Sequence, residues 1–273
     1  MCYYNGIKVS RLEYIRLKDL EASIKHMQAL MKPMVDGFDF GNTIVLRASD
    51  DGSTIVADQM EWGFIPSYIK NRDEVGKMRR GYMGAKGFIQ PRPNLNAKSE
   101  NLFMNEDRTR TAIFADAARN HRCLVLSTGF YEWRHLPRIG KQGQELKTKE
   151  PFPYHIELKD REYFYMAGVW QPWTDQQTGE MVNTVAIVTT EANPLMKVIH
   201  NKDNKWRMPT ILPDELGEEW ILGNLPDERI YEIGHYQYPW DQMEACTVDK
   251  SFKEIEEPYK HVPYPQVPAI SLT

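Results

Sequence analysis

The clearest pattern along the chain is a series of short segments rich in β-branched and aromatic residues in its second half. Such segments are typical of β-strands, because these side chains suit a pleated, half-buried surface. The strands predicted in this part of the chain are 122–127, 129–134, 154–158, 163–173, 184–190 and 208–212. Another strand is predicted over 54–65, before a turn at Pro66. The polar stretch 139–150 lies between two strands and is predicted to be a hairpin loop.

Helical periodicity is confined to shorter stretches. Apolar residues recur at helical spacing from 18 to 34, which predicts an amphipathic helix that ends at or near Pro33. The segment 71–93 is rich in Gly, Arg and Lys and is predicted to be a long loop. The tail from Pro258 onward holds four prolines and is predicted to be extended. Further short helices are predicted over 111–120, 193–199 and 213–222.

This pattern predicts an α+β fold, a single compact domain built on a β-rich, barrel-like core with peripheral helices. No Pro/Gly/Ser-rich linker divides the 273 residues, so we expect one domain over 1–273, with 258–273 as its extended C-terminal tail. Apolar residues make up 41% of the chain, enough for a buried core. No stretch approaches the roughly 18 apolar residues of a membrane span, and the first ten residues do not resemble a signal peptide. We therefore expect a cytoplasmic protein with no membrane contact.

The net charge of −4 conceals a strong asymmetry. Between Lys70 and Lys98 the chain has eight basic and two acidic residues, whereas 213–257 has thirteen acidic and three basic. Each stretch can be simply a solvated face. The basic one can also provide a local phosphate-binding surface on an acidic protein.

The three cysteines are too few, and too widely spaced, for a disulfide framework or a zinc site, so we expect no metal and no cofactor. Cys123 lies in an apolar run and is expected in the core. Cys2 directly follows Met1, and a small residue there permits removal of Met1. Cys2 would then carry an α-amine and a thiol on adjacent carbons. The amine can condense with an aldehyde, and the thiol can close a thiazolidine ring on the same carbon. A cysteine at this position can also be incidental.

Four other residues are candidates for chemistry or binding, each with a plain structural alternative. Glu132 lies between aromatic residues in a predicted strand and can act as a general acid or base, or occupy a polar strand face. His200 follows a short helix and can move protons near pH 7, or be structural. Asn96 can position a substrate or cap a helix. Trp62, beside Gly63, can stack on a base if exposed, or belong to the core.

These motifs are weak individually, but their order is informative. The chain holds, in sequence, Met-Cys, Trp-Gly-Phe-Ile-Pro, Asn-Ala-Lys-Ser-Glu, Gly-Phe-Tyr-Glu-Trp, Ala-Gly-Val-Trp, Thr-Thr-Glu-Ala-Asn, Ile-His and Arg-Met-Pro. From residue 2 to about 212 it closely resembles the SOS-response-associated peptidase (SRAP) family, whose members are also called abasic-site processing proteins. The resemblance implies a mostly β single domain with a positively charged groove for single-stranded DNA. It also implies a lyase-like enzyme whose N-terminal cysteine forms a thiazolidine crosslink with the ring-opened sugar of an abasic site.

Carried over position by position, the resemblance implies roles for individual residues. The nucleophile, the positioning amide, the acid/base carboxylate and the histidine that assists ring opening and reversal would be Cys2, Asn96, Glu132 and His200. The residues where the family's groove contacts DNA would be Trp62, Lys98 and Thr189. DNA phosphates are expected on the side of Arg79, Arg80, Arg92 and Lys98. The implied partner is single-stranded DNA containing abasic sites, and we expect the protein to be a monomer.

The chain departs from the family pattern in three places. Tyr3 and Tyr4 stand where Gly-Arg is usual, and Lys98 replaces an arginine, which keeps the charge but loses bidentate geometry. Six residues, 201–206, separate His200 from Arg207, a longer spacing than usual. Two other functions remain open. One is a cysteine peptidase that uses Cys2, with removal of Met1 as its minimal reaction. The other is a non-catalytic single-strand-binding module.

Overall fold

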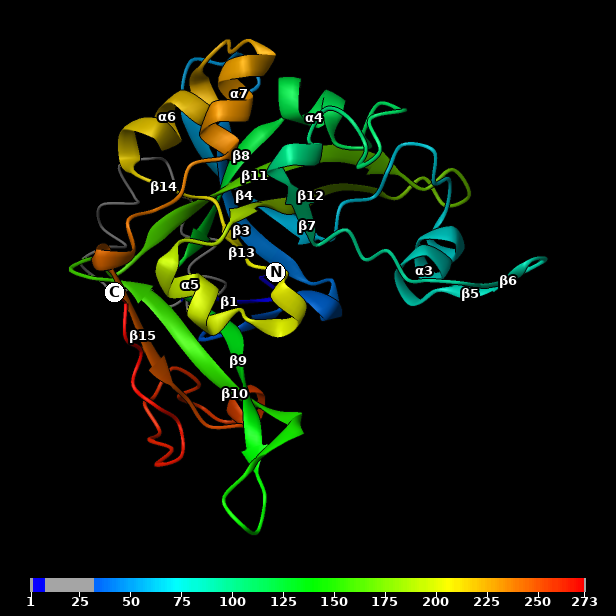
Figure 1. The fold of residues 1–273 in the computed structure, drawn as a ribbon. Helices are drawn as coiled ribbons and strands as arrows, with labels where there is room; N and C mark the ends of the chain where they lie inside the picture. Colours follow the sequence, from blue (N-terminus) through cyan, green and yellow to red (C-terminus); the bar gives the residue numbers. More distant parts are fainter. Residues whose placement is uncertain (1, 8–31, 273) are drawn as a thin grey trace.

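Five strands close into a barrel at the centre of the molecule (Figure 1). In the computed structural model, which describes residues 2–7 and 32–272, β12 (Met181–Glu191) pairs with β4 (Ile55–Trp62) on one edge and β11 (Phe164–Thr174) on the other. β3 (Asn42–Ala48) and β8 (Arg122–Ser127) complete the ring between β4 and β11. The predicted α+β fold with a barrel-like core is therefore confirmed.

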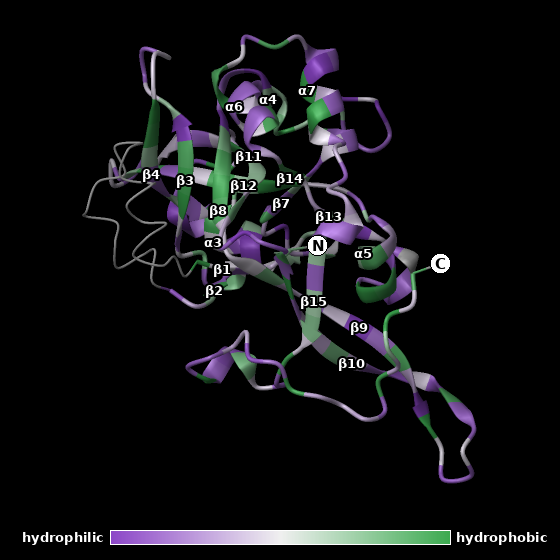
Figure 2. Ribbon diagram, turned by 90° about the vertical axis from the view of Figure 1, so that its left-hand side faces the viewer, coloured by the Kyte–Doolittle hydropathy of each residue, from purple (hydrophilic) through white to green (hydrophobic). Residues whose placement is uncertain are grey.

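Strand β8 is the barrel strand that is buried along its whole length. Every residue of β8 is buried, and Figure 2 shows this strand in the hydrophobic colour. Helix α6 (Asp214–Leu222) packs outside it, where the Trp220 indole donates to the Cys123 carbonyl at 3.0 Å. The Arg122 guanidinium donates to the Trp220 carbonyl at 2.6 Å. Two further helices lie at the same end of the barrel, α4 (Ala115–Asn120) and α7 (Asp227–Gly234).

A second sheet of five strands holds the N-terminal segment. Its order is β15-β10-β9-β1-β2, with bounds Met243–Thr247, Glu145–Leu158, Gly129–Ile139, Tyr4–Gly6 and Val35–Asp36. Strand β1 lies inside this sheet, because Asn5 pairs with Phe130 of β9 on one side and with Val35 of β2 on the other. Cys2, two residues before β1, is thus placed by a strand with neighbours on both edges.

Short elements at the end of β12 join the two sheets. β7 (Asn96–Lys98) runs parallel to β12, and β13 (Arg207–Pro209) runs antiparallel to it. β14 (Ile211–Leu212) pairs with β11, and α5 (Pro194–Ile199) follows β12 directly. Within residues 2–7 and 32–272, the 3-10 helices are Gly37–Asp39, Ser99–Asn101, Lys202–Asn204, Trp240–Gln242 and Phe252–Glu254.

The prediction of a loop over 71–93 was wrong. Asn71 caps helix α3 (Arg72–Arg80), accepting a hydrogen bond from the Glu74 N–H at 2.9 Å. The helix has acidic residues in its first turn and basic residues in its last, as its dipole favours. After Gly81, whose φ of 76° suits glycine, the hairpin of β5 (Tyr82–Gly84) and β6 (Gly87–Ile89) projects from the body (Figure 1). The Gly, Arg and Lys content of 71–93 is typical of a loop, but the Asn71 cap and the order of charges along 72–80 favour a helix.

The polar stretch 139–150 is only partly a loop. β9 continues to Ile139 and β10 begins at Glu145, so only 140–144 join them. The far end of this hairpin projects into solvent and is mostly hydrophilic (Figure 2). Its strand residues are therefore polar, and their sequence resembles that of a loop. The tail contacts the second sheet, where the Arg134 guanidinium donates to the Pro268 carbonyl at 2.7 Å, and it contains two turns, closed by hydrogen bonds from Lys260 to Glu257 and from Val267 to Tyr264. Most of the helix predicted over 18–34 lies outside the described residues. No described helix is long and apolar enough to cross a membrane.

Candidate active site

Cys2 lies where the barrel meets the second sheet. Its side chain is fully buried, and its thiol donates to the Tyr4 carbonyl at 3.7 Å. The Asn96 side chain, from β7, donates through Nδ2 to the Cys2 carbonyl at 3.0 Å. Asn96 Oδ1 is buried and has no hydrogen-bond partner in the part of the chain that the structure describes. Asn96 therefore links the barrel to the backbone of Cys2 and keeps one acceptor unused.

Glu132 lies in β9, which runs beside the N-terminal strand. Asn5 of the N-terminal strand pairs with Phe130, two residues before Glu132. The Glu132 side chain is buried, and its charge acts on its neighbours. Burial raises the pKa of the Cys2 thiol, and the Glu132 carboxylate raises it further. The same two causes raise the pKa of Tyr3 to about 12. The Cys2 thiol is consequently protonated at neutral pH.

His200 is held at the end of α5 by its neighbours in β13. Its Nδ1 accepts from the Arg207 N–H at 3.1 Å and lies 3.0 Å from the Arg207 carbonyl. Burial lowers the pKa of His200, and the Glu132 carboxylate partly offsets this effect. His200 is therefore neutral at pH 7, and it belongs to the same electrostatic cluster as Cys2 and Glu132.

The insertion 201–206 does not carry His200 away from β9. At its start, Asn201 and His135 exchange two hydrogen bonds, from the His135 N–H to Asn201 Oδ1 at 2.8 Å and from Asn201 Nδ2 to the His135 carbonyl at 3.0 Å. At its end the chain enters β13, beside β12. The loop thus leaves and returns close to the cluster of Cys2, Asn96, Glu132 and His200, which the fold brings together from four segments.

A cavity of about 850 Å³ opens next to this cluster. Tyr3 and His200 form part of its wall, so it lies directly over the segment that carries Cys2. Basic and acidic side chains alternate around it, with one indole. The remaining lining residues are Lys98, Glu106, Glu191, Lys202, Asp203, Lys205, Trp206 and Arg207.

Two of the predicted DNA contacts are buried, which corrects their predicted role. Trp62 is fully buried, and its indole donates to the Leu95 carbonyl at 2.9 Å, so its ring presents no face to a base. Thr189 is also fully buried, and its hydroxyl accepts from Arg207 Nη2 at 3.1 Å. Arg207 itself is bound to both carboxylate oxygens of Glu100. Trp62 supports the core, and Thr189 positions Arg207, a cavity residue that had not been assigned a role.

The predicted phosphate contacts divide into one inaccessible and three accessible side chains. The Arg79 side chain is only 9% exposed, pairs with Glu61 at 2.6 Å and lies over the Phe40 ring at 3.9 Å, so the expectation of a phosphate contact is corrected. Arg80 and Arg92 are exposed. Lys98 lines the cavity beside Tyr3 and pairs with the largely exposed Glu106 at 3.3 Å.

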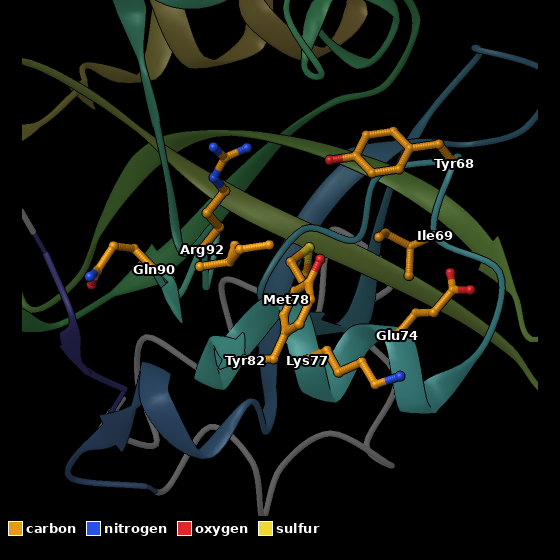
Figure 3. Close-up of a pocket in the computed structure, with 9 residues that line it drawn as sticks. Tyr68, Ile69, Glu74, Lys77, Met78, Tyr82, Gln90 and Arg92 are labelled. Atoms are coloured by element: carbon orange, nitrogen blue, oxygen red, sulfur yellow. The ribbon is translucent and has the colours of Figure 1, made fainter. Parts of the chain in front are cut away.

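A second cavity, of about 590 Å³, lies between α3 and the β5–β6 hairpin (Figure 3). Arg92 and Lys77 are among its lining residues, together with two exposed aromatic side chains, Tyr68 and Tyr82. Neither tyrosine was predicted to bind DNA, since nothing in a single sequence marks an aromatic residue as exposed. Among the described residues, no group of three or more His, Cys, Asp or Glu side chains could hold a metal ion.

Comparison with known proteins places the chain in a family. The model of the family described as SOS response associated peptidase (SRAP) matches residues 12–255. The chain belongs to this family. Among relatives of this SRAP protein, the abasic site processing protein YoqW of Bacillus subtilis is 29% identical over 204 residues, 75% of this chain and 74% of YoqW. The abasic site processing protein HMCES of Gallus gallus is 28% identical over 180 residues, 63% of this chain and 46% of HMCES.

Solved structures share the fold of the SRAP protein. The crystal structure of a Bacteroides thetaiotaomicron protein covers 96% of this chain and 100% of its own, with a TM-score of 0.76 and 24% identity. A Bordetella bronchiseptica protein covers 91% of this chain and 100% of its own, with a TM-score of 0.62 and 19% identity. The resemblance inferred from the motifs is therefore confirmed at the level of family and fold.

Proposed function

We propose that this SRAP-family protein processes abasic sites in single-stranded DNA by capturing the aldehyde of the opened sugar with Cys2, after Met1 has been removed. One observation carries the proposal. A buried cysteine at position 2 lies in one electrostatic cluster with a carboxylate and a histidine, and its carbonyl is held by an amide side chain. The curated relatives named for abasic site processing support the same substrate class.

Removal of Met1 would turn the Cys2 nitrogen from an amide into a primary amine. The amine adds to the aldehyde carbon and forms a carbinolamine, which loses its hydroxyl as water to give an imine. The thiol sulfur then adds to the same carbon, and its proton passes to the nitrogen. The result is a five-membered thiazolidine, formed with the net release of one water and with no change in oxidation state.

Glu132 and Asn96 suit the proton transfers and the positioning that this sequence needs. The Glu132 carboxylate would accept a proton from the amine and return it to the departing hydroxyl, the general acid–base role. Asn96 Nδ2 holds the Cys2 carbonyl, and Oδ1 is left to accept from the amine. Two contacts from one side chain would fix the direction in which the amine attacks.

His200 suits the opening of the sugar ring. Both contacts with Arg207 engage Nδ1, at 3.1 Å from the N–H and 3.0 Å from the carbonyl, so the ring is held through this nitrogen and Nε2 is the nitrogen proposed to act on the sugar. When Nε2 carries a proton, it can donate to the ring oxygen as the sugar opens to the aldehyde. Protonation of His200 would make it a stronger acid, so ring opening is expected to accelerate as pH falls below the pKa of His200.

DNA is expected to cross the face that carries Lys98, Arg80 and Arg92, which are accessible to phosphates. Tyr68 and Tyr82 offer exposed rings beside Arg92 and can stack on unpaired bases, a role that Trp62 cannot fill. An acidic protein can bind DNA in this way because a local excess of cations can outweigh the net charge.

The state of the Cys2 thiol argues against the peptidase alternative. A peptidase cysteine is activated by a lowered pKa, usually beside a protonated histidine. Here burial and Glu132 raise the pKa of Cys2, and burial lowers that of His200. An amine that attacks before the thiol does not need a thiolate for its first step, which fits aldehyde capture better.

The test is incubation with a single-stranded oligonucleotide that contains one abasic site, followed by a denaturing gel and intact mass measurement. Intact mass first establishes that Met1 is absent. The expected product is a heat-stable band whose mass equals protein plus oligonucleotide less one water. Cys2→Ala should give no such band while it still binds the DNA. Binding by the wild-type protein without a covalent band would support the binding module, and cleavage of unrelated peptides would support the peptidase.

A further inference from the structure

We propose that Trp206, on the insertion between His200 and Arg207, stacks on the nucleobase next to the abasic sugar, with Lys202 and Lys205 holding the adjoining phosphates. This inference rests on the proposed function and adds a specificity-determining contact to it. The 201–206 segment departs from the family spacing, and none of the proposed catalytic steps uses it.

Trp206 faces the cavity from which the substrate would approach. Its side chain is 41% exposed, although an indole of this size is ordinarily covered in a folded domain. It lines the cavity together with His200 and Tyr3, the residue that follows Cys2. An exposed ring at this place is available to what enters the cavity beside the reacting group.

Two backbone hydrogen bonds and a neighbouring lysine support the segment that carries the Trp206 ring. The Trp206 carbonyl accepts from the Ala192 N–H at 3.3 Å, and the Lys205 N–H donates to the Lys202 carbonyl at 3.1 Å. The Lys197 ammonium lies 5.9 Å from the ring centroid and pairs with Glu191 at 2.7 Å. Contacts of this kind reduce the conformational entropy that the ring would lose when a base stacks on it.

The size of the cavity and two lysines in its wall suit a nucleotide strand better than a lone sugar. A volume of about 850 Å³ lies in the upper part of the range for drug-sized ligands, so it admits the abasic sugar together with a neighbouring nucleotide. Lys202 and Lys205 are exposed, and neither forms an ion pair with a described residue. Their ammonium groups are available to phosphate oxygens. An aromatic ring flanked by such lysines is the usual arrangement for single-stranded nucleic acid.

Stacking on Trp206 would make capture depend on the neighbouring base, and a set of oligonucleotides can measure this. The abasic site is flanked on both sides by adenines, by thymines, or by baseless tetrahydrofuran spacers. Two quantities are measured, the second-order rate of adduct formation and the Kd in a Cys2→Ala background. Trp206→Ala is compared with Trp206→Phe and with Trp240→Ala. Trp240 is 40% exposed but does not line the cavity, which makes it a matched control.

Stacking on an aromatic side chain is worth about 1–3 kcal/mol per base, so Trp206→Ala should lower the rate and affinity for the adenine-flanked substrate by about 5- to 150-fold. The loss should be smaller with thymine and should vanish with baseless spacers. Trp206→Phe should retain most of the wild-type values, and Trp240→Ala should retain all of them.

Equal losses on all three substrates, or no loss on any, would overturn the stacking role of Trp206. The proposed function fails separately, if the wild-type protein lacking Met1 forms no adduct with any of the oligonucleotides. In that case the Kd values in the Cys2→Ala background still decide whether Trp206 contacts the neighbouring base.

Discussion

Glu132→Gln is the substitution that most sharply tests the proposed chemistry. It keeps the size of a buried side chain in β9 but removes both a proton acceptor and a negative charge. Because the carboxylate acts on Cys2, Tyr3 and His200 together, its loss should have different consequences for the amine and for the thiol.

The rate of adduct formation should fall by about 10²- to 10⁴-fold, the usual contribution of a general acid or base, which corresponds to about 2.7–5.4 kcal/mol in the barrier. The reactivity of the Cys2 thiol should change in the opposite direction and increase. Removal of the neighbouring negative charge lowers its pKa, so iodoacetamide should label it faster, although burial still keeps that pKa above its ordinary value. DNA affinity should be unchanged or slightly higher, because the variant carries one negative charge less.

The assay combines a single-turnover adduct rate, iodoacetamide labelling of Cys2, and the Kd for an oligonucleotide with an unreactive tetrahydrofuran site. Glu157→Gln in β10 is the control, a half-exposed carboxylate whose charge acts on Cys246 and Tyr131 and not on Cys2. An adduct rate for Glu132→Gln within a factor of about 3 of the wild-type rate would refute the acid–base role of Glu132.

Three further predictions concern stability and DNA binding. Trp62→Ala should lower the free energy of unfolding by about 3–5 kcal/mol in urea titrations while the folded protein keeps its DNA affinity; a selective loss of affinity would restore Trp62 as a DNA contact. Arg92→Ala should weaken binding and reduce the slope of log affinity against log salt by about 1, whereas Arg79→Ala should leave that slope unchanged and destabilise the fold instead. Burial lowers the pKa of His155 from 6.5 to about 4, so the unfolded chain binds more protons below pH 6.5. Stability should therefore fall by about 3 kcal/mol between about pH 6.5 and pH 4, and His155→Gln should flatten this dependence; an equally steep profile in the variant would exclude His155 as the cause.

Local sequence was sufficient to predict an element where one conformational preference of its residues was much stronger than the others. Strand β8 matches its prediction because a continuous apolar, β-branched run between turns can hardly form anything else. Helix α5 begins as expected because Asn193 is a strong cap and Pro194 is favoured at the first helical position. The candidate catalytic residues were found for a different reason. Their motifs are weak individually, but the set and its order resemble one family, and the fold then brings their segments together.

The errors share a physical cause, because exposure is decided by contacts distant in sequence. Trp62 ends a strand of the barrel, and the carbonyl that accepts from its indole belongs to Leu95, in the segment before β7. Arg79 has the composition of a phosphate contact, but Glu61 and Phe40 hold it. Trp206 differs from Trp62, because the fold exposes it at the cavity. Its neighbours in the sequence do not predict this exposure. A single sequence shows these residues, but it does not show the long-range contacts that bury them or leave them exposed.

The position of β1 inside the second sheet has a consequence for the order of events during synthesis. Asn5 pairs with Phe130, so the strand that fixes Cys2 gains its β9 neighbour only after about half of the chain has been made. At roughly 5–20 residues per second, the first residues wait for about 6–25 seconds before that neighbour exists. During this interval an enzyme acting on the ribosome can reach Met1. Once β9 has emerged and paired, Cys2 can take up its buried position, so removal of Met1 during this interval precedes the formation of the site.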